Sequence, residues 1–214
     1  MILEFKNVSG TNKGFNLKNV SFQLEEGYIM GIIGKNGAGK TTLLNYITRS
    51  ELSYSGEILY KGINIKEIGQ DLFNHIGIVS DDNALFPKCT VRENAALLSC
   101  FYSDWNQERF MEALKELECP TDRVVMRMSR GEKLKLQMAL AIGHNAKLFL
   151  LDEATSGMDP VFRKEFYHML HNMMESEDRS VIMTNHNMEE ITLHMDFMAR
   201  MDKGQLMEYK EALD

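Results

Sequence analysis

A short apolar segment that breaks at a glycine-rich turn and resumes as a helical pattern constrains this chain more than any other feature. It covers residues 28–42 and reads Tyr-Ile-Met-Gly-Ile-Ile-Gly-Lys-Asn-Gly-Ala-Gly-Lys-Thr-Thr. Its first part is short and rich in isoleucine, which is typical of a buried strand. Four residues then follow the spacing Gly, four residues, Gly-Lys-Thr: Gly34, Gly39, Lys40 and Thr41. The segment therefore predicts a strand, a tight loop and a helix, in that order.

A loop of this kind binds the phosphates of a nucleotide. Its glycines let backbone N–H groups converge on an anion, and the following helix points its positive end at that anion. Lys40 can reach the β- and γ-phosphates, and the Thr41 hydroxyl can ligate Mg²⁺. A glycine-rich turn without this purpose would not require the strand before it and the helix after it. We expect a nucleoside triphosphate to contact Gly34, Lys35, Asn36, Gly37, Ala38, Gly39, Lys40, Thr41 and Thr42.

Two adjacent carboxylates give the second signal. Residues 147–151 form a continuous apolar run after one lysine, as in a strand buried on both faces, and Asp152 and Glu153 follow it. A carboxylate at the end of such a strand can hold Mg²⁺ through its water shell, which is the usual companion of a phosphate loop. Glu153 can orient and deprotonate an attacking water. We therefore assign Asp152 to the metal and Glu153 to catalysis.

The order of predicted elements indicates an α/β fold. Residues 2–5 and 20–24 alternate as half-buried antiparallel strands do, and residues 76–79 suit a central strand. From about 90 to 143 the periodicity is helical, with apolar residues on one side of each helix. We expect one domain over residues 1–214: a P-loop NTPase core with a mostly parallel central sheet, an N-terminal antiparallel β-subdomain and an inserted α-helical subdomain.

The net charge and the hydropathy of the chain limit the kinds of partner that it is expected to bind. The net charge of −7 gives no reason to expect binding to nucleic acid or to an anionic membrane surface. No apolar run approaches the roughly eighteen residues that a membrane helix needs. A role at a membrane would therefore depend on a separate partner subunit.

Further short motifs complete an ordered series. Ser129, Arg130, Gly131 and Glu132 open a predicted helix, where serine is a good N-cap, and by itself this pattern indicates only a cap. The series runs through residues 34–42, 129–132, 151–153, 156–159 and 184–186. In this order and over nearly the whole length, the chain resembles the ATP-binding-cassette (ABC) ATPases.

The resemblance implies a nucleotide-binding domain that dimerises head to tail, with ATP and Mg²⁺ as its ligands. ATP would lie between the phosphate loop of one protomer and the signature residues of the other, of which Ser129, Gly131 and Glu132 would contact the nucleotide. His186 matches the switch histidine that contacts the γ-phosphate. Asp159 matches the loop that crosses the dimer interface.

Some residues depart from the family's pattern. Asp81 aligns with the glutamine expected after residues 76–79; as a carboxylate it could ligate Mg²⁺ or hold the attacking water, but it brings negative charge near the triphosphate. Arg130 and Glu132 replace the commoner glycine and glutamine of the signature. These features, with the runs 101–105 and 18–22, resemble a branch of bacterial exporters. The aromatic residue that stacks on adenine in the family is not obvious, and Phe15 is the nearest candidate.

The sequence therefore predicts the ATPase subunit of a membrane exporter. Its expected partners are a transmembrane permease subunit and a second ABC protomer, as homodimer or heterodimer, at the cytoplasmic face of the cell membrane. A soluble ABC ATPase, such as one for iron–sulphur cluster assembly, is the main alternative. A regulatory subunit without turnover conflicts with the presence of Lys40, Asp152, Glu153 and His186.

Overall fold

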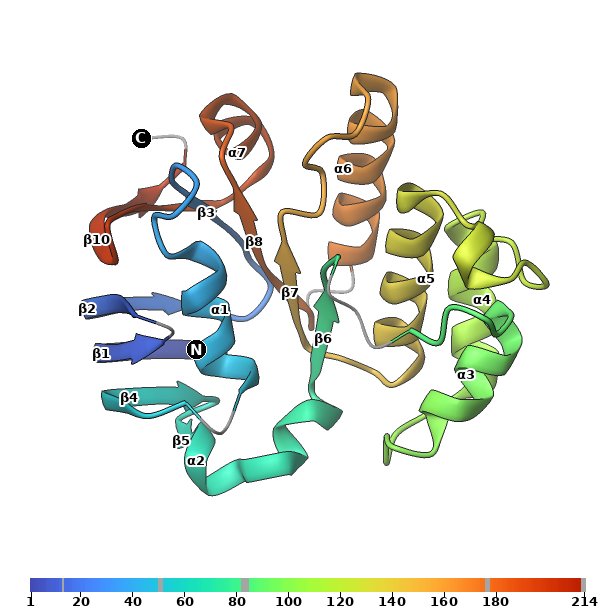
Figure 1. Cartoon of the computed structure of the whole chain (residues 1–214), viewed down its shortest axis with the longest axis horizontal. Coiled ribbons are helices and arrows are strands. Elements are labelled where there is room, and N and C mark those ends of the chain that lie inside the picture. Colours follow the sequence, from blue (N-terminus) through green and yellow to red (C-terminus); the bar gives the residue numbers. More distant parts are fainter. Residues whose placement is uncertain (13, 50–51, 82–84, 176–177, 213–214) are drawn as a thin grey trace.

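A computed structural model describes residues 1–12, 14–49, 52–81, 85–175 and 178–212 of the chain. These residues form two β-sheets with helices around them (Figure 1). Three helices of the segment 90–143 lie together on one side of the larger sheet, and the antiparallel strands lie on the other side. Within the described residues, no helix is long and apolar enough to cross a bilayer.

The larger sheet has six strands in the order β10-β9-β3-β8-β7-β6. Its strands are β3 Ile29–Ile33, β6 Ile76–Val79, β7 Leu148–Asp152, β8 Ser180–Asn185, β9 Phe197–Asp202 and β10 Gln205–Glu211. All neighbouring strands pair in parallel except β9 and β10, which form an antiparallel hairpin. The predicted mostly parallel sheet is therefore confirmed.

Alternation along the buried strands divides the core into two clusters. Leu148 and Leu150 of β7 pack into one cluster, whereas Phe149 and Leu151 pack into the other. Because successive side chains of a strand point to opposite faces, a continuous apolar run fills both clusters at once. This is why the segment before Asp152 shows no polar positions.

The strand β6 differs from its expected central position. It lies at the edge of the described sheet, paired with β7, and the side chain of Ile78 is 41% exposed. Ile78 lines the cavity of the candidate site. Its apolar side chain therefore borders that cavity and is not covered by a neighbouring strand.

The smaller sheet is antiparallel and has the strand order β2-β1-β4-β5. Its strands are β1 Leu3–Asn12, β2 Phe15–Leu24, β4 Tyr54–Tyr60 and β5 Ile63–Asn64. Phe5 and Phe22 stack with their ring centroids 4.6 Å apart, in the core cluster that also receives helix α1 Lys40–Thr48. The smaller sheet thus packs against the helix that follows the phosphate loop.

The helices of the segment 90–143 are α3 Val91–Ser99, α4 Gln107–Glu116 and α5 Arg130–Gly143, with the 3₁₀ turn Val125–Arg127 before α5. The remaining helices are α2 Ile65–Ile68, the 3₁₀ helix Gly69–Asn74, α6 Pro160–Met174 and α7 Met188–His194. The division into one domain over 1–214, with a subdomain inserted at about 90–143, stays a prediction.

Candidate nucleotide-binding site

The turn between β3 and α1 has the tight backbone that its glycines predict. A Cβ on Gly39, whose φ is +109°, would lie 2.7 Å from Cε1 of Phe15. A Cβ on Gly34 would lie 2.6 Å from the carbonyl oxygen of Met201 in β9. The tip of the β9–β10 hairpin also touches the turn, since the N–H of Gly204 donates to the carbonyl of Ala38 at 2.9 Å. The turn is therefore packed on residues from both ends of the chain.

Lys40 is held at the start of α1 although it is only 4% exposed. Its ammonium donates to the carbonyl of Gly34 at 2.8 Å and lies 3.3 Å from Oε1 of Glu153. A buried ammonium requires acceptors or an opposite charge. The structure thus brings Lys40 and the catalytic candidate Glu153 together at the cavity.

Asp152 and Glu153, at the end of β7, both form a hydrogen bond with Thr184. The hydroxyl of Thr184 donates to Oδ1 of Asp152 at 2.6 Å, and Oγ1 of Thr184 accepts the backbone N–H of Glu153 at 2.9 Å. Glu153 itself has a φ of +48°, a left-handed conformation that few residues adopt. This turn directs the Glu153 side chain toward Lys40.

A cavity of about 810 Å³ joins these groups. Nine of the predicted site residues line it: Asn36, Gly37, Gly39, Lys40, Thr41, Thr42, Asp81, Asp152 and Glu153. Phe15 lines it as well, which supports its assignment as the aromatic candidate. The cavity thus combines the glycine turn, one ammonium, threonine hydroxyls and three carboxylates, and this set includes the groups that a magnesium–triphosphate requires. The residues present therefore fit ATP with Mg²⁺.

In the part of the chain that the structure describes, the remaining predicted residues do not line this cavity: Gly34, Lys35, Ala38, Ser129, Gly131, Glu132, Asp159 and His186. Gly34, Lys35 and Ala38 form the turn itself, and the first two offer their carbonyls to Lys40, at 2.8 and 3.5 Å. The other five lie elsewhere in the same chain.

Ser129 is exposed and caps α5. Its hydroxyl accepts the N–H of Glu132 at 3.2 Å, and the Glu132 carboxylate accepts the N–H of Ser129 at 2.8 Å, so the two form a capping box. Glu132 also contacts Arg123. These hydrogen bonds lower the pKa of Glu132, and the one from the Ser129 backbone contributes most. Glu132 thus stabilises the turn that presents Ser129.

Gly131 lies where α5 meets α6. A Cβ at this position would stand 2.5 Å from Cε2 of Phe162, well inside van der Waals contact. The signature glycine therefore allows these two helices to pack closely. Asp159 caps α6, the helix that carries Phe162. It accepts the N–H groups of Val161 and Phe162, both at 3.0 Å.

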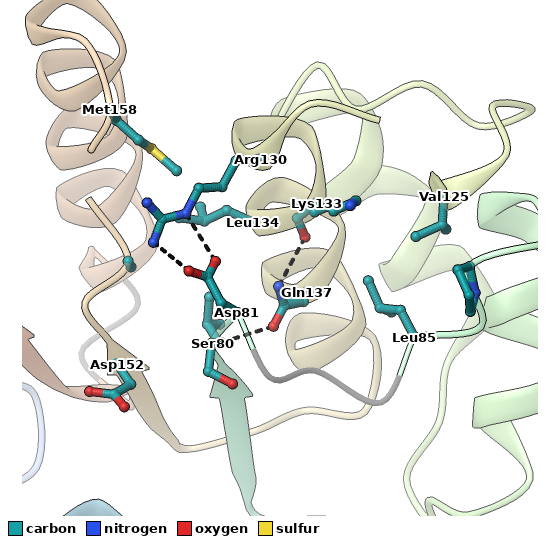
Figure 2. A pocket seen from close by; sticks show the side chains of 13 residues that line it. Ser80, Asp81, Leu85, Val125, Arg130, Lys133, Leu134, Gln137, Asp152 and Met158 are labelled. Carbon is teal, nitrogen blue, oxygen red and sulfur yellow. Dashed lines mark hydrogen bonds and ion pairs between the residues drawn. The ribbon is translucent and has the colours of Figure 1, made fainter. Parts of the chain in front are cut away.

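Asp81 does not contact Asp152 or the phosphate loop through any described hydrogen bond or ion pair. Its carboxylate meets the guanidinium of Arg130, with 2.9 Å from Nε to Oδ1 and 2.8 Å from Nη2 to Oδ2 (Figure 2). The neighbouring Ser80 donates its N–H to Oε1 of Gln137 at 2.9 Å, which ties the same segment to α5. Residues 82–84, which follow Asp81 and include Asp82, lie outside the described residues.

His186 is exposed after β8, and its backbone N–H donates to Oδ1 of Asn185 at 2.7 Å. The loop that carries it rests on Glu190, a residue that the motifs did not single out. Glu190 accepts hydrogen bonds from Asn185 and Tyr167, both at 2.9 Å, and contacts Arg163. Burial raises the pKa of Glu190, but these hydrogen bonds outweigh it and keep the pKa below its usual range.

Sequence reasoning did not single out Glu190, and it gave Thr184 no role of its own beyond its place in the motif 184–186. A threonine at the end of a strand and a glutamate in a short amphipathic helix carry no signal of their own. The contacts of these two residues become evident only in the three-dimensional structure.

Comparison with known proteins decides which family these features indicate. A family model described as ABC transporter matches residues 17–156, well over half of the 214 residues. The chain belongs to the ABC transporter family. Its family members bind and hydrolyse ATP, so the predicted resemblance and the P-loop NTPase fold are confirmed.

Several relatives of this ABC ATPase are named for transport. ABC transporter ATP-binding protein YtrB of Bacillus subtilis is 31% identical over 175 residues, which are 82% of this chain and 60% of that protein. Methionine import ATP-binding protein MetN of Clostridioides difficile is 33% identical over 202 residues, covering 90% of this chain and 63% of that protein. The human ATP-binding cassette sub-family A member 10 is 30% identical, and the chain covers 13% of it. The chain thus spans less than two thirds of each of these relatives.

Solved structures agree on the fold. The cbiO1 structure from Clostridium perfringens, part of the ABC transporter complex cbiONQ, superposes with a TM-score of 0.86 at 25% identity, covering 99% of this chain and 88% of that one. The ATP-binding cassette MJ0796, a dimer bound to ADP and Pi, superposes with a TM-score of 0.85 at 24% identity and covers all of both chains.

Proposed function

We propose that this ABC ATPase binds and hydrolyses ATP in a head-to-tail dimer that powers transport, in the direction of export, through a separate membrane subunit. One observation carries the proposal: the cavity gathers Lys40, Thr41, Asp152 and Glu153, whereas Ser129 is exposed and lies outside it. A cavity with the phosphate loop and carboxylates but without the signature serine is half of an ABC site. The second half comes from another protomer.

Within one protomer, the backbone N–H groups of the loop and Lys40 bind the phosphates. Thr41 and Asp152 would hold Mg²⁺, which supplies positive charge against the β- and γ-phosphate oxygens. Thr184 fixes the orientation of Asp152 through its 2.6 Å hydrogen bond. Phe15 is proposed to stack on the base, which its position in the lining of the same cavity supports.

Glu153 then acts as the general base. It accepts a proton from the attacking water while the water oxygen bonds to the γ-phosphorus and the bond to the bridging oxygen of ADP breaks. Its ion pair with Lys40 at 3.3 Å keeps the carboxylate beside the phosphate site before nucleotide arrives. His186 and Asp159 are proposed to join the site at the dimer interface, as the sequence predicted.

The signature turn of the partner protomer completes the site. Ser129 accepts one hydrogen bond within its capping box, so its own hydroxyl hydrogen can be donated to a phosphate oxygen. The N-terminus of α5, fourteen residues long, adds the positive end of its dipole. The MJ0796 cassette, which has the same fold and forms a dimer, supports this arrangement.

A permease subunit is the proposed membrane partner, which would hold the protein at the cytoplasmic face of the membrane. Three large apolar side chains stand exposed near residues 81–91 and along α3: Phe86, Leu97 and Phe101. We propose that these side chains form part of the contact with the permease. The cbiONQ complex, of which cbiO1 is part, supports assembly with membrane subunits.

The dimer is tested with Glu153→Gln, which should bind ATP without hydrolysing it. Sedimentation should show a dimer with ATP and a monomer without it. Adding Lys40→Ala to the same variant is the control and should abolish the dimer. A Glu153→Gln protein that stays monomeric with saturating ATP contradicts the head-to-tail site.

The membrane role is tested by purifying the intact complex from membranes. Transport predicts a hydrophobic subunit that co-purifies with the ATPase in fixed ratio. A protein recovered without such a subunit, but with a cluster-assembly partner, would support the soluble alternative. The direction is decided by reconstituting the complex in vesicles and identifying the face from which substrate is removed.

A further inference from the structure

Two of the three positions at which this chain departs from the family's motifs touch each other: Asp81 and Arg130. Asp81 follows β6, and Arg130 opens α5, 49 positions later. Figure 2 shows their side chains facing one another across the space between sheet and helix, joined by contacts of 2.9 and 2.8 Å. Two parallel contacts between a planar guanidinium and a carboxylate fix orientation as well as distance. The glutamine and glycine of the commoner pattern offer no such pair.

The same guanidinium also holds the turn after β7. Arg130 donates to the backbone carbonyl of Ser156 through Nη1 and to that of Glu153 through Nη2, the latter at 3.3 Å. One cation therefore connects three parts of the ATPase: the end of β6, the turn that carries Glu153, and the start of the signature helix. A guanidinium has five N–H donors in a fixed plane, which suits it to several acceptors at once.

We propose that Asp81 and Arg130 form a positioning pair for ATP hydrolysis. The ion pair holds Arg130 against the carbonyls of residues 153 and 156, and so sets the catalytic Glu153 and the signature Ser129 relative to each other within one protomer. Asp81 then acts through Arg130 and not as a ligand of Mg²⁺. The proposal rests on the proposed ATPase function.

Two features of the contacts support a positioning role. Both oxygens of Asp81 face nitrogen atoms of Arg130, so a metal would have to displace a bidentate partner. The side chains of Asp81 and Arg130 are 71% and 39% exposed, so solvent screens their attraction and the pair adds little to global stability. Its effect is therefore expected in the geometry of the site.

The first test compares Asp81→Asn, Arg130→Gln and the double variant in ATPase assays on the full chain. Each single variant should lower kcat about tenfold, a typical loss for residues that couple through contact. The double variant should be no slower than either single one, because the pair is already broken. The Mg²⁺ concentration for half-maximal rate should be the same in all three. Arg130→Lys, which keeps the charge but not the planar fork, should recover part of the loss.

A matched control is available in the helical segment. Arg92 and Asp122 form an exposed ion pair with the same Nε–Oδ1 distance of 2.9 Å, and neither residue lines the cavity. Arg92→Gln and Asp122→Asn should leave kcat near that of the unaltered protein. A tenfold loss in the control as well would mean that removal of any surface pair slows the enzyme, and would overturn the proposal.

Two other outcomes overturn it. If Asp81→Asn alone shifts the Mg²⁺ requirement and Arg130→Gln does not, Asp81 is a metal ligand. If the losses of the single variants multiply in the double variant, the two residues act independently.

A second test needs no nucleotide. The N–H groups of Ser156 and Met158 donate to the carbonyls of Glu153 and Thr155 at 3.0 and 3.2 Å, within the turn that Arg130 holds. Hydrogen exchange of these two amides should become faster, and equally so, in Asp81→Asn, Arg130→Gln and the double variant. Unchanged exchange overturns the positioning pair. Failure of ATP hydrolysis in the unaltered chain would instead overturn the proposed function, and the exchange experiment would still decide the pair.

Discussion

The Oγ1 of Thr184 lies 2.6 Å from Oδ1 of Asp152, because β7 and β8 are parallel and in a register that sets these two residues side by side. Thr184 is fully buried, and it also accepts the N–H of Glu153. One hydroxyl thus fixes the metal candidate and the backbone of the catalytic candidate. The precision of the carboxylate site comes from a strand that carries no carboxylate.

Thr184→Val should therefore impair the site, because it removes the hydroxyl while the volume of the side chain stays nearly the same. Loss of a supporting hydrogen bond of this kind typically costs about 10- to 100-fold in metal affinity or activity. We expect a lower kcat and a higher Mg²⁺ concentration for half-maximal rate, measured by titrating Mg²⁺ at saturating ATP. Thr184→Ser keeps the hydroxyl and is the control. Equal behaviour of the two variants would show that the hydroxyl does not act on the metal site.

Gly131→Ala should weaken the dimer while leaving the phosphate loop intact. The new Cβ would stand 2.5 Å from Phe162, so α5 and α6 must separate and the signature turn must move. ATP-driven dimerisation of the Glu153→Gln protein, followed by sedimentation, should need at least about tenfold more protein, the effect of 1–3 kcal/mol of overpacking. Adding Phe162→Leu should restore much of the loss. A dimer unaffected by Gly131→Ala would contradict this packing argument.

Phe15→Ala should reduce nucleotide affinity. The ring lines the cavity and packs against Gly39, so its removal takes away both a stacking surface and support for the loop. A stacked aromatic pair is worth about 0.5–1.5 kcal/mol, which is a loss of roughly 2- to 10-fold in ATP binding. Calorimetry with ATP and GTP measures it. Phe15→Tyr should bind as the unaltered protein does, and an unchanged Phe15→Ala affinity would remove Phe15 from the site.

A buried histidine makes stability depend on pH. His144 is 2% exposed, stacks on Tyr102 with ring centroids 3.9 Å apart, and has Nδ1 3.4 Å from the carbonyl oxygen of Asn74. Burial lowers the pKa of His144 from 6.5 to about 4. The unfolded chain therefore binds a proton at pH values where the folded protein does not. Stability that is present above pH 6.5 is lost progressively as the pH falls toward 4.

Urea unfolding at pH 7.5 and pH 5 measures this loss. With a pKa near 6.5 unfolded and about 4 folded, His144 should account for about 2 kcal/mol of the decrease in unfolding free energy between the two pH values. His144→Gln cannot be protonated and should show a decrease smaller by that amount. An identical pH dependence in both proteins would show that His144 is not neutral in the folded state.

The sequence predicted those parts of the fold whose signal is local. The phosphate loop is a single continuous segment, and the run before Asp152 is apolar at every position because both of its faces are buried. The first strands were harder to predict, since apolar and polar residues alternate clearly only over residues 2–5 and 20–24. In the structure β1 continues to Asn12, but its register with β2 shifts between Phe5 and Val8, next to Asn7 with a φ of +51°. A bulge of this kind breaks the period of two on which a strand prediction depends.

The site was predictable only as far as its motifs reached. The contact between Asp81 and Arg130 depends on how α5 packs beside β6, and the contact between Thr184 and Asp152 depends on strand register. Neither relationship is encoded in a local pattern. Ser129 was predicted as a helix cap, which it is, and Asp159 caps a helix as well.

Gly204 is a neighbour of the phosphate loop, and its position limits how far the chain can be truncated without loss of ATP binding. A fragment ending before β9 would contain every one of the five motifs, yet the loop would lose the carbonyl of Met201 beside Gly34 and the hydrogen bond from Gly204 to Ala38. The family model matches only as far as residue 156, so the matched segment includes neither Met201 nor Gly204. A minimal ATP-binding fragment must therefore include the β9–β10 hairpin, because this hairpin packs against the loop that binds the phosphates.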